Sequence, residues 1–339
     1  MSVPTYTADT VVLRAGDGTE AHVIPSVGAV CAVCRTPTEA GWAQLLAPVV
    51  SIEALRERPT SVGGFPVLFP HPGRHRVPLR WRGREIRPPA VSGDGLVGHG
   101  YAAGSAWTVT ARSEESVTCR LESRDIPGAE ERWPWAAALT ATYRVGPRAL
   151  AFELEIESQA EEPAPSMPGL HPYFPLRLLE GDGSSAEDER RTCWVWVDAP
   201  EIWMAAPGAP TGEFIPVSGS TDIREPRSIE EIEGSYGGKM PVLLYTRRAT
   251  GNAKSGVTSG VWDRAAGLAV VFETSADFGT VALYRPPDPR RVSLEPRAAL
   301  PDALYVAATQ PEIPTGLRTL APGERYRVSA RLTLAPKQS

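Results

Sequence analysis

Three short segments of the sequence set an ionisable side chain beside glycine or proline residues. His171 lies in Gly-Leu-His-Pro-Tyr-Phe at 169–174, His99 lies in Gly-His-Gly-Tyr at 98–101, and Glu295 precedes a proline. A histidine next to a proline is disfavoured inside a helix, so we expect His171 at a strand end or on a rigid loop. An imidazole with a pKa near 6.5 can donate or accept a proton at neutral pH. These segments predict one cleft in which a histidine and a carboxylate transfer protons.

The aromatic residues beside His171 indicate what such a cleft would bind. Tyr173 and Phe174 follow the histidine within three positions. A sugar ring has apolar faces that pack on aromatic rings, and hydroxyl groups that need hydrogen-bond partners. Glu295 ends an otherwise apolar segment, and burial there would raise its pKa and make it a usable base. A proton-transfer site for a sugar is the functional interpretation.

Each of these residues also has a purely structural interpretation. A single histidine is more often a hydrogen-bonded structural residue than a catalyst, and His99 is equally a candidate turn residue. Glu295 would then be an exposed carboxylate at a rim. The Pro-rich run 63–74 ends in Arg74, which would either bind a ligand or lie on a solvated turn. Local sequence leaves both interpretations open.

The signatures of several other chemistries are missing. Cys31 and Cys34 form a Cys-x-x-Cys pair, but residues three apart on a strand point to opposite faces, and no second pair completes a zinc site. We interpret them as buried structural thiols. The sequence has no His-Glu-x-x-His, no Gly-x-Ser-x-Gly and no phosphate-binding loop ending in Gly-Lys-Ser/Thr. Neither a metal nor a cofactor is predicted.

Composition restricts the class of partner. The formal net charge is -5 and the sequence pI is about 5.7, with no basic patch, so nucleic acid is not an expected partner. No apolar run is long enough to span a membrane, so no membrane association is expected. The segment 1–5 lacks the basic start and apolar core of a secretion signal. A cytoplasmic location is predicted.

The distribution of turns and apolar residues predicts an all-β protein. The chain has 34 Pro and 31 Gly but is 42% hydrophobic, which indicates a folded chain with many turns and few, short helices. Apolar and polar residues alternate over 137–145, 149–157 and 325–334, as in half-buried antiparallel strands. Ser51 is expected to cap a helix over 51–58, whereas 180–191 and 220–236 are expected to be irregular. Upwards of a dozen strands without βα alternation predict a large antiparallel β-sandwich in a single domain over 1–339.

Taken together, these segments resemble the aldose 1-epimerase (galactose mutarotase-like) family. Their order and spacing carry the resemblance, which runs from about residue 23 to residue 334. The matching segments are Gly-Gly-Phe-Pro at 63–66 with Arg74, the runs around His99 and His171, Thr-Asp-Ile-Arg-Glu-Pro at 221–226, and Glu295 with Pro-Asp-Ala at 301–303. The fold of that family is a large antiparallel β-sandwich, the galactose mutarotase-like super-sandwich.

The resemblance implies an isomerase that interconverts the α and β anomers of a free aldose. His171 would be the general acid that protonates the ring oxygen, and Glu295 the general base that takes the proton of the C1 hydroxyl. His99, Arg74 and Tyr173 would bind the sugar. The acid and base are expected on opposite sides of C1, separated by a gap of hexose size. Each proton transfer typically contributes roughly 10²–10⁴-fold.

The chain departs from the best-known family members at two places. Those members carry Asn before the arginine that matches Arg74, where this chain has Gly73, and a sugar-binding Asp near 234–238, which here holds no acid. The hydroxyl preference is therefore open, and a hexose 6-phosphate bound through Arg74 and Arg76 is another candidate substrate. The alternative function is a non-catalytic carbohydrate-binding or sensing module on the same fold. A hydrolase or lyase ranks last, because only one carboxylate stands out. We expect a small-molecule sugar as the partner, and a monomer or a homodimer.

Overall fold

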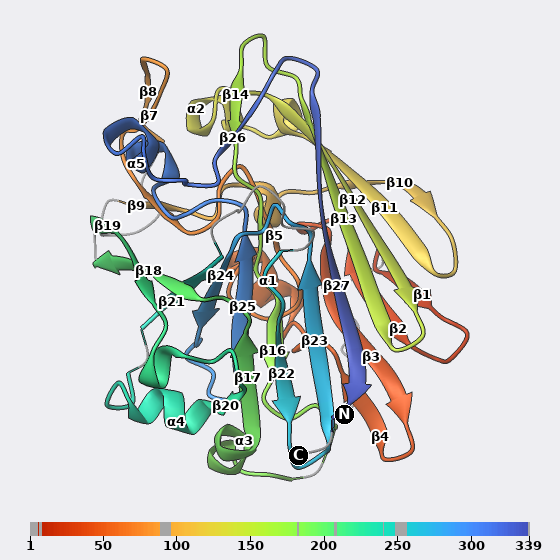
Figure 1. The fold of residues 1–339 in the computed structure, drawn as a ribbon. Helices are drawn as coiled ribbons and strands as arrows, with labels where there is room; N and C mark the ends of the chain where they lie inside the picture. Colours follow the sequence, from red (N-terminus) through yellow and green to blue (C-terminus); the bar gives the residue numbers. More distant parts are fainter. Residues whose placement is uncertain are drawn as a thin grey trace.

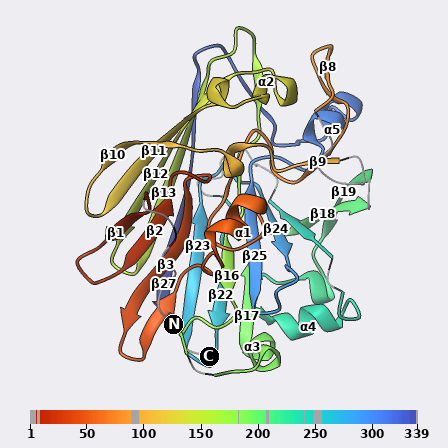
Figure 2. The same ribbon diagram turned by 180° about the vertical axis from the view of Figure 1, so that it is seen from behind.

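Two large antiparallel β-sheets lie face to face and form the body of the molecule (Figures 1 and 2). The structure is a computed structural model, which describes residues 6, 9–88, 96–181, 183–206, 209–239, 241–247 and 256–337. All ladders between its named strands are antiparallel. The predicted all-β class and large antiparallel sandwich are confirmed.

The first large sheet has nine strands. Their order is β10 (Thr108–Arg112), β11 (Ser116–Glu122), β12 (Ala137–Gly146), β13 (Ala149–Ser158), β27 (Arg325–Pro336), β23 (Leu268–Thr274), β22 (Ser259–Asp263), β17 (Cys193–Val197) and β20 (Arg227–Ser228). The alternation predicted over 149–157 is observed, because Phe152, Leu154 and Ile156 are buried in β13 while Glu153 is exposed.

The second large sheet carries the candidate site. Its order is β19 (Ala209–Pro216), β18 (Glu201–Ala206), β21 (Leu243–Thr246), β24 (Thr280–Tyr284), β25 (Arg291–Arg297), β15 (Gly169–Leu170) and β5 (Val67–Leu68), and β16 (Tyr173–Pro175) also pairs with β25. Aromatic rings join the two sheets: Phe174 of β16 lies 5.8 Å from Phe272 of β23 between ring centroids. Strand β25 is therefore an interior strand, fixed on both edges and packed against the opposite sheet.

Smaller sheets and short helices complete the fold. A four-stranded sheet contains β1 (Val11–Arg14), β2 (Glu20–Ile24), β3 (Val30–Thr38) and β4 (Gly41–Gln44). The two-stranded ribbons are β6 (Arg74–Arg76) with β9 (Leu96–Gly98), β7 (Leu79–Trp81) with β8 (Arg84–Ile86), and β14 (Ala164–Ser166) with β26 (Arg318–Leu320). The helices are α1 (Ile52–Glu57), α2 (Ala129–Arg132), α3 (Ala186–Thr192), α4 (Ile229–Gly234) and α5 (Ala303–Thr309), with 3₁₀ turns at Ala102–Gly104, Ser123–Asp125 and Gly219–Thr221. Among the described residues, no helix has the length and apolar character needed to cross a membrane.

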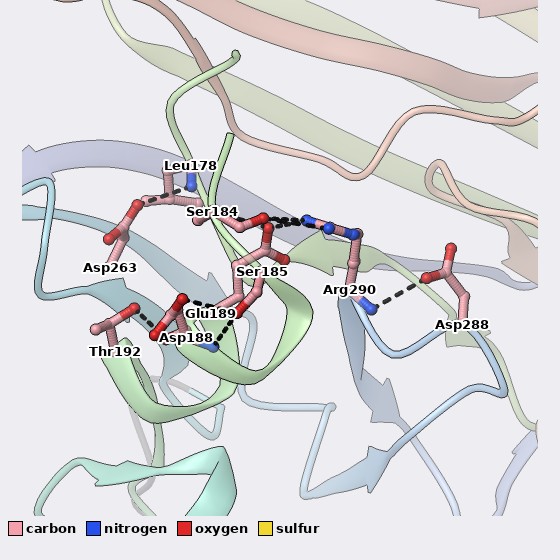
Figure 3. A network of polar contacts seen from close by, with 9 residues as sticks. All are labelled: Leu178, Ser184, Ser185, Asp188, Glu189, Thr192, Asp263, Asp288 and Arg290. Atoms are coloured by element: carbon pink, nitrogen blue, oxygen red, sulfur yellow. Dashed lines mark hydrogen bonds and ion pairs between the residues drawn. The ribbon is translucent and has the colours of Figure 1, made fainter. Parts of the chain in front are cut away.

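The helix predictions were partly wrong. Ser51 caps α1 as expected, and its hydroxyl accepts from the Ala54 N–H at 3.1 Å. However, α3 and α4 lie inside the two stretches predicted to be irregular. Each is a short helix with a capped N-terminus: Ser185 accepts from the Asp188 N–H in α3, and Ser228 forms a capping box in α4. Figure 3 shows α3 in a polar network that extends beyond the helix.

The Cys-x-x-Cys segment was predicted with the right burial but the wrong geometry. Cys31 and Cys34 are free thiols, and both are fully buried. They do not point to opposite faces but join the same core cluster. The pairing of β2 with β3 shifts register between His22 and Val23, so that β3 contains one extra residue. A bulge of this kind breaks the two-residue alternation on which the prediction depended.

Candidate functional site

A row of polar residues on β25 forms the base of the site. Ser293, Glu295 and Arg297 alternate along the strand and therefore point to the same face of the sheet. They are 0%, 2% and 5% exposed, respectively. We call these three residues the β25 row. Because β25 is paired on both edges, its pleat sets their relative positions.

His171 faces this row from the neighbouring strand. β15 and β16 pair with opposite ends of β25 in a single register, and His171, in the break between them, falls opposite Glu295. Directly opposed residues in an antiparallel pair have side chains within reach of each other. The His171 Nε2 atom lies 3.3 Å from Glu295 Oε1. The predicted acid and base are thus brought into direct contact.

Each member of this pair has a second fixed partner. Glu295 Oε2 accepts from the Arg297 guanidinium, with a distance of 2.6 Å to Nη2. His171 Nδ1 lies 3.1 Å from the hydroxyl of Ser293. The His171 ring also stacks on Tyr173, with centroids 4.9 Å apart and an interplanar angle of 15°. These contacts fix the position of both the imidazole and the carboxylate.

Two further predicted residues lie on the β6–β9 ribbon next to this pair. His99 follows β9 in a left-handed conformation, with φ of 57°, and its ring centroid is 5.2 Å from that of His171. Its Nδ1 accepts from the Gly73 N–H at 3.3 Å, so a neutral ring carries its proton on Nε2. Arg74, at the start of β6, is exposed and pairs in register with Gly98. The ribbon therefore places one imidazole beside the His171–Glu295 pair and carries the exposed Arg74 on its other strand.

Tyr173 occupies a different position from the one expected for a residue that binds substrate. It is fully buried, and its hydroxyl donates to the Thr60 carbonyl oxygen at 2.8 Å. In this arrangement Tyr173 supports the His171 ring from one face.

Arg76, considered as a phosphate ligand, is engaged by a carboxylate. Its backbone N–H and its Nε both donate to Asp302 at 2.7 Å, and its guanidinium lies over the Tyr305 ring. Asp302 belongs to the Pro-Asp-Ala segment at 301–303, so this part of the family pattern has a structural role here: it joins α5 to β6.

The predicted gap between acid and base is not observed. A distance of 3.3 Å is hydrogen-bond contact and leaves no space for a sugar ring between the two side chains. The ring oxygen and the C1 hydroxyl oxygen of an aldose are bonded to the same carbon. Side chains that serve these two oxygens can therefore lie close to each other, and His171 and Glu295 do so here.

Burial is the main cause of a lowered pKa at both histidines of the site. Burial, and next the charge of Arg297, lower the pKa of His171 to about 3, while the Glu295 carboxylate in contact with it favours the charged ring. Burial also lowers the pKa of His99 to about 3, with a smaller contribution from His171. Each ring is consequently neutral at pH 7 unless an adjacent anion stabilises its cation, and for His171 that anion is Glu295.

Within the described part of the chain, no group of three or more His, Cys, Asp or Glu side chains is placed to hold a metal ion. A cavity of about 1010 Å³ lies elsewhere, at the 3₁₀ turn Ser123–Asp125 and α2, with Trp133 and Trp135 in its wall. None of the predicted site residues lines it. The His171–Glu295 pair lies outside the wall of this cavity.

Comparison with known proteins identifies the family. The family described as aldose 1-epimerase matches residues 9–333, which is nearly the whole chain. The chain belongs to the aldose 1-epimerase family. No match was found among curated protein sequences.

Solved structures show the same fold at low sequence identity. A galactose mutarotase-like protein from Clostridium acetobutylicum has a TM-score of 0.79 at 19% identity, covering 96% of this chain and 95% of that one. An aldose epimerase homologue from C. elegans also gives 0.79, at 18% identity, with 98% and 100% covered. A galactose 1-epimerase from Lactobacillus acidophilus gives 0.73 at 16% identity, with 99% and 98% covered. The galactose mutarotase-like fold expected from the resemblance is confirmed.

The departure at Gly73 has a structural explanation in this aldose 1-epimerase family member. Gly73 has φ of +70°, and a Cβ atom there would lie 2.8 Å from Arg297 Nη1. Absence of a side chain at 73 thus makes room for the Arg297 guanidinium. Near the second departure, Glu233 of α4 is committed to ion pairs with Arg190 and Arg285.

Two residues of the site were missed from the sequence, namely Ser293 and Arg297. The signal that could have revealed them is a polar residue at every second position of an otherwise apolar strand.

Proposed function

We propose that the protein is an aldose 1-epimerase in which His171 and Glu295 open and close the sugar ring by proton transfer. The direct contact between His171 Nε2 and Glu295 Oε1, on the interior strand of a member of this family, carries the proposal. A buried imidazole and a buried carboxylate at 3.3 Å favour sharing one proton, because a bare lone pair on nitrogen would repel the anion. The pair then has two forms, imidazolium with carboxylate and neutral imidazole with carboxylic acid.

Ring opening converts one form of the pair into the other. Imidazolium Nε2–H of His171 protonates the ring oxygen, the C1–O5 bond breaks, and Glu295 takes the proton of the C1 hydroxyl as the aldehyde forms. After rotation about C1–C2, Glu295 returns its proton to the carbonyl oxygen while the C5 hydroxyl attacks C1 and gives its proton to His171. Proton count and charge balance in each direction, and no proton need be exchanged with solvent. Concerted transfer avoids both a free alkoxide and an oxocarbenium ion.

The residues of the β6–β9 ribbon have supporting roles in this scheme. The Nε2–H of His99 is a hydrogen-bond donor for the ring oxygen or a neighbouring hydroxyl. Arg74 would bind hydroxyl groups at the rim. Because Arg76 is held by Asp302, the arrangement favours an unphosphorylated aldose over a hexose 6-phosphate.

The test is anomer exchange on a panel of sugars. Polarimetry of freshly dissolved α-glucose and α-galactose, and NMR exchange spectroscopy of equilibrated aldoses and hexose 6-phosphates, measure the catalysed rate directly. We expect faster exchange for at least one unphosphorylated aldose. No acceleration with any aldose or aldose phosphate would refute the proposal, and acceleration confined to phosphates would overturn the preference for a neutral sugar.

Matched variants separate catalysis from binding. Glu295→Gln and His171→Asn keep approximate shape but remove proton transfer, whereas the control Glu153→Gln changes an exposed carboxylate on β13, in the other large sheet. The carbohydrate-binding alternative predicts a different result. Sugar binding would saturate, but wild type and both site variants would exchange anomers only at the uncatalysed rate.

A further inference from the structure

Ser293 occupies a position from which it controls the protonation of the candidate acid. Its side chain is 0% exposed, on β25 two residues before Glu295. The Oγ atom lies 2.7 Å from the Pro172 carbonyl oxygen and 3.1 Å from His171 Nδ1. The hydroxyl therefore has one neighbour that can only accept a hydrogen bond and one that can either donate or accept.

Counting protons decides how these two contacts are made. A serine hydroxyl has one proton and two lone pairs, and a carbonyl oxygen has only lone pairs. The short contact with Pro172 therefore uses the hydroxyl proton. The contact with His171 is then favourable only if Nδ1–H donates to Oγ. Nδ1 is protonated in this arrangement, and Nε2, opposite Glu295, is the nitrogen that gains and loses a proton.

We propose that Ser293 is a positioning residue that holds His171 in the tautomer protonated on Nδ1, and so makes the Nε2 proton acidic enough for the aldose 1-epimerase reaction. This inference rests on the proposed function. With Nδ1–H fixed, a proton on Nε2 belongs to an imidazolium, which is a far stronger acid than a neutral imidazole. In the other tautomer, Nε2–H would belong to a neutral imidazole and would bond to Glu295 without being transferable. Ser293 excludes that unproductive form.

The pleat of β25 sets the positions of Ser293 and Glu295 relative to each other. Ser293 and Glu295 are alternate residues of one interior strand, and both face the same imidazole. The tautomer and the position of the base are consequently fixed together. Other polar or ionisable groups that face or influence the ring from the elements packed around it are Arg297 on β25, His99 after β9, Tyr173 on β16 and Tyr284 on β24.

The first experiment measures the tautomer in the unmodified protein and needs no turnover. Long-range ¹⁵N–¹H NMR spectra of protein labelled with ¹⁵N-histidine distinguish a protonated Nδ1 from a protonated Nε2, and His171→Asn assigns the signal. We expect Nδ1–H for neutral His171 throughout the titration. A neutral His171 protonated on Nε2 would overturn the inference. Failure of the aldose assay alone would instead bear on the proposed function.

The second experiment compares Ser293→Ala with Ser293→Thr, which retains the hydroxyl. For Ser293→Ala we expect kcat to fall about 10- to 100-fold, less than the loss on removing the acid, with KM unchanged. As pH rises, kcat of this variant should begin to fall at a lower pH than kcat of wild type, because the lost hydrogen bond had favoured the charged ring. Ser293→Thr should restore both properties. Wild-type kcat and pH profile in Ser293→Ala would contradict the inference, and if neither variant folds, the NMR measurement decides.

Discussion

Two buried carboxylates in this protein, Asp263 and Glu295, differ in what holds them. Asp263 ends β22, and its side chain has no exposed area. It accepts from the backbone N–H groups of Leu178 and Ala266, each at 3.0 Å, and from the Arg177 guanidinium at 2.8 Å; Figure 3 shows the Leu178 contact. Backbone donors cannot lose their protons, so the groups that hold this carboxylate fix its position and offer it no partner for proton transfer along the backbone.

Glu295 is equally buried but, among the described residues, it contacts only side chains. Arg297 is permanently charged, whereas His171 is itself able to give up or take a proton. Asp263 joins elements together, while Glu295 is anchored on one oxygen and open to proton exchange on the other. Burial alone therefore does not distinguish these two carboxylates, whereas the chemical nature of their donors does.

The largest expected effect concerns the pair itself. Glu295→Gln and His171→Asn should each lower kcat by roughly 10²–10⁴-fold, and the double variant should be no slower than the slower single one. Residues that act as one proton-sharing unit give strongly non-additive losses. Anomer exchange by NMR, with folding verified by thermal melts, measures this. Additive losses would show that the two side chains act independently.

The second prediction is that a change at Asp263 lowers stability and leaves activity unchanged. Asp263→Asn replaces one acceptor oxygen by a donor that faces other donors, so unfolding free energy should fall by roughly 3–5 kcal/mol. Activity per folded molecule should stay near that of wild type. Asp288→Asn is the matched control in the same network, since its carboxylate is 40% exposed and should contribute only about 0–1 kcal/mol. Equal losses in a denaturant titration would remove the distinction between the two carboxylates.

A third prediction uses pH to test burial of the histidines. All five histidines have a lowered pKa, mainly through burial, and that of His171 falls to about 3. In the unfolded chain the rings bind protons near pH 6.5, so unfolding takes up protons between about pH 6.5 and the lower native values. Unfolding free energy should therefore rise with pH through this window and decrease as pH falls below about 6.5.

The measurement is chemical denaturation at a series of pH values. His71, which is buried against Trp133 and His75, provides the matched variant His71→Phe. Removing one such group should reduce the slope by up to about 1.4 kcal/mol per pH unit. A flat profile across this window would mean that the rings are accessible to protons in the native state.

The smallest expected effect tests the space beside Arg297. Gly73→Ala and Gly83→Ala both place a side chain at positive φ, which costs about 1–2 kcal/mol. Only at Gly73 would the new Cβ meet the Arg297 guanidinium, because nothing lies within 4 Å at Gly83. Gly73→Ala should therefore lose more stability than its control and should also lower kcat. Indistinguishable variants would show that Arg297 has room to move.

Much of the fold followed from alternation along single segments. Strand β13 shows its buried and exposed faces directly in the sequence, as does β27. The helices α3 and α4 were not recognised from periodicity, because each has too few residues to display a 3.6-residue period. The Ser228–Glu231 capping box was nevertheless readable in advance.

The site was predictable in its members but not in its contacts. His171 and Glu295 are 124 positions apart, and only the shared register of β15 and β16 on β25 brings them opposite each other. Ser293 and Arg297 were readable as a polar alternation, yet their partners depend on that same register. Long-range strand pairing is not encoded in any one segment, so neither the direct contact nor the tautomer could be derived beforehand.

The division of the site between an interior strand and a separate ribbon has an evolutionary consequence. The groups proposed to transfer protons lie on β25 and in the break between β15 and β16, whereas Arg74 lies on the β6–β9 ribbon and His99 directly follows it. Under the proposed function, a substitution of Arg74 would alter which hydroxyl pattern is accepted and would leave His171 and Glu295 in place. One scaffold can in this way acquire new sugars while the means of opening them is inherited intact.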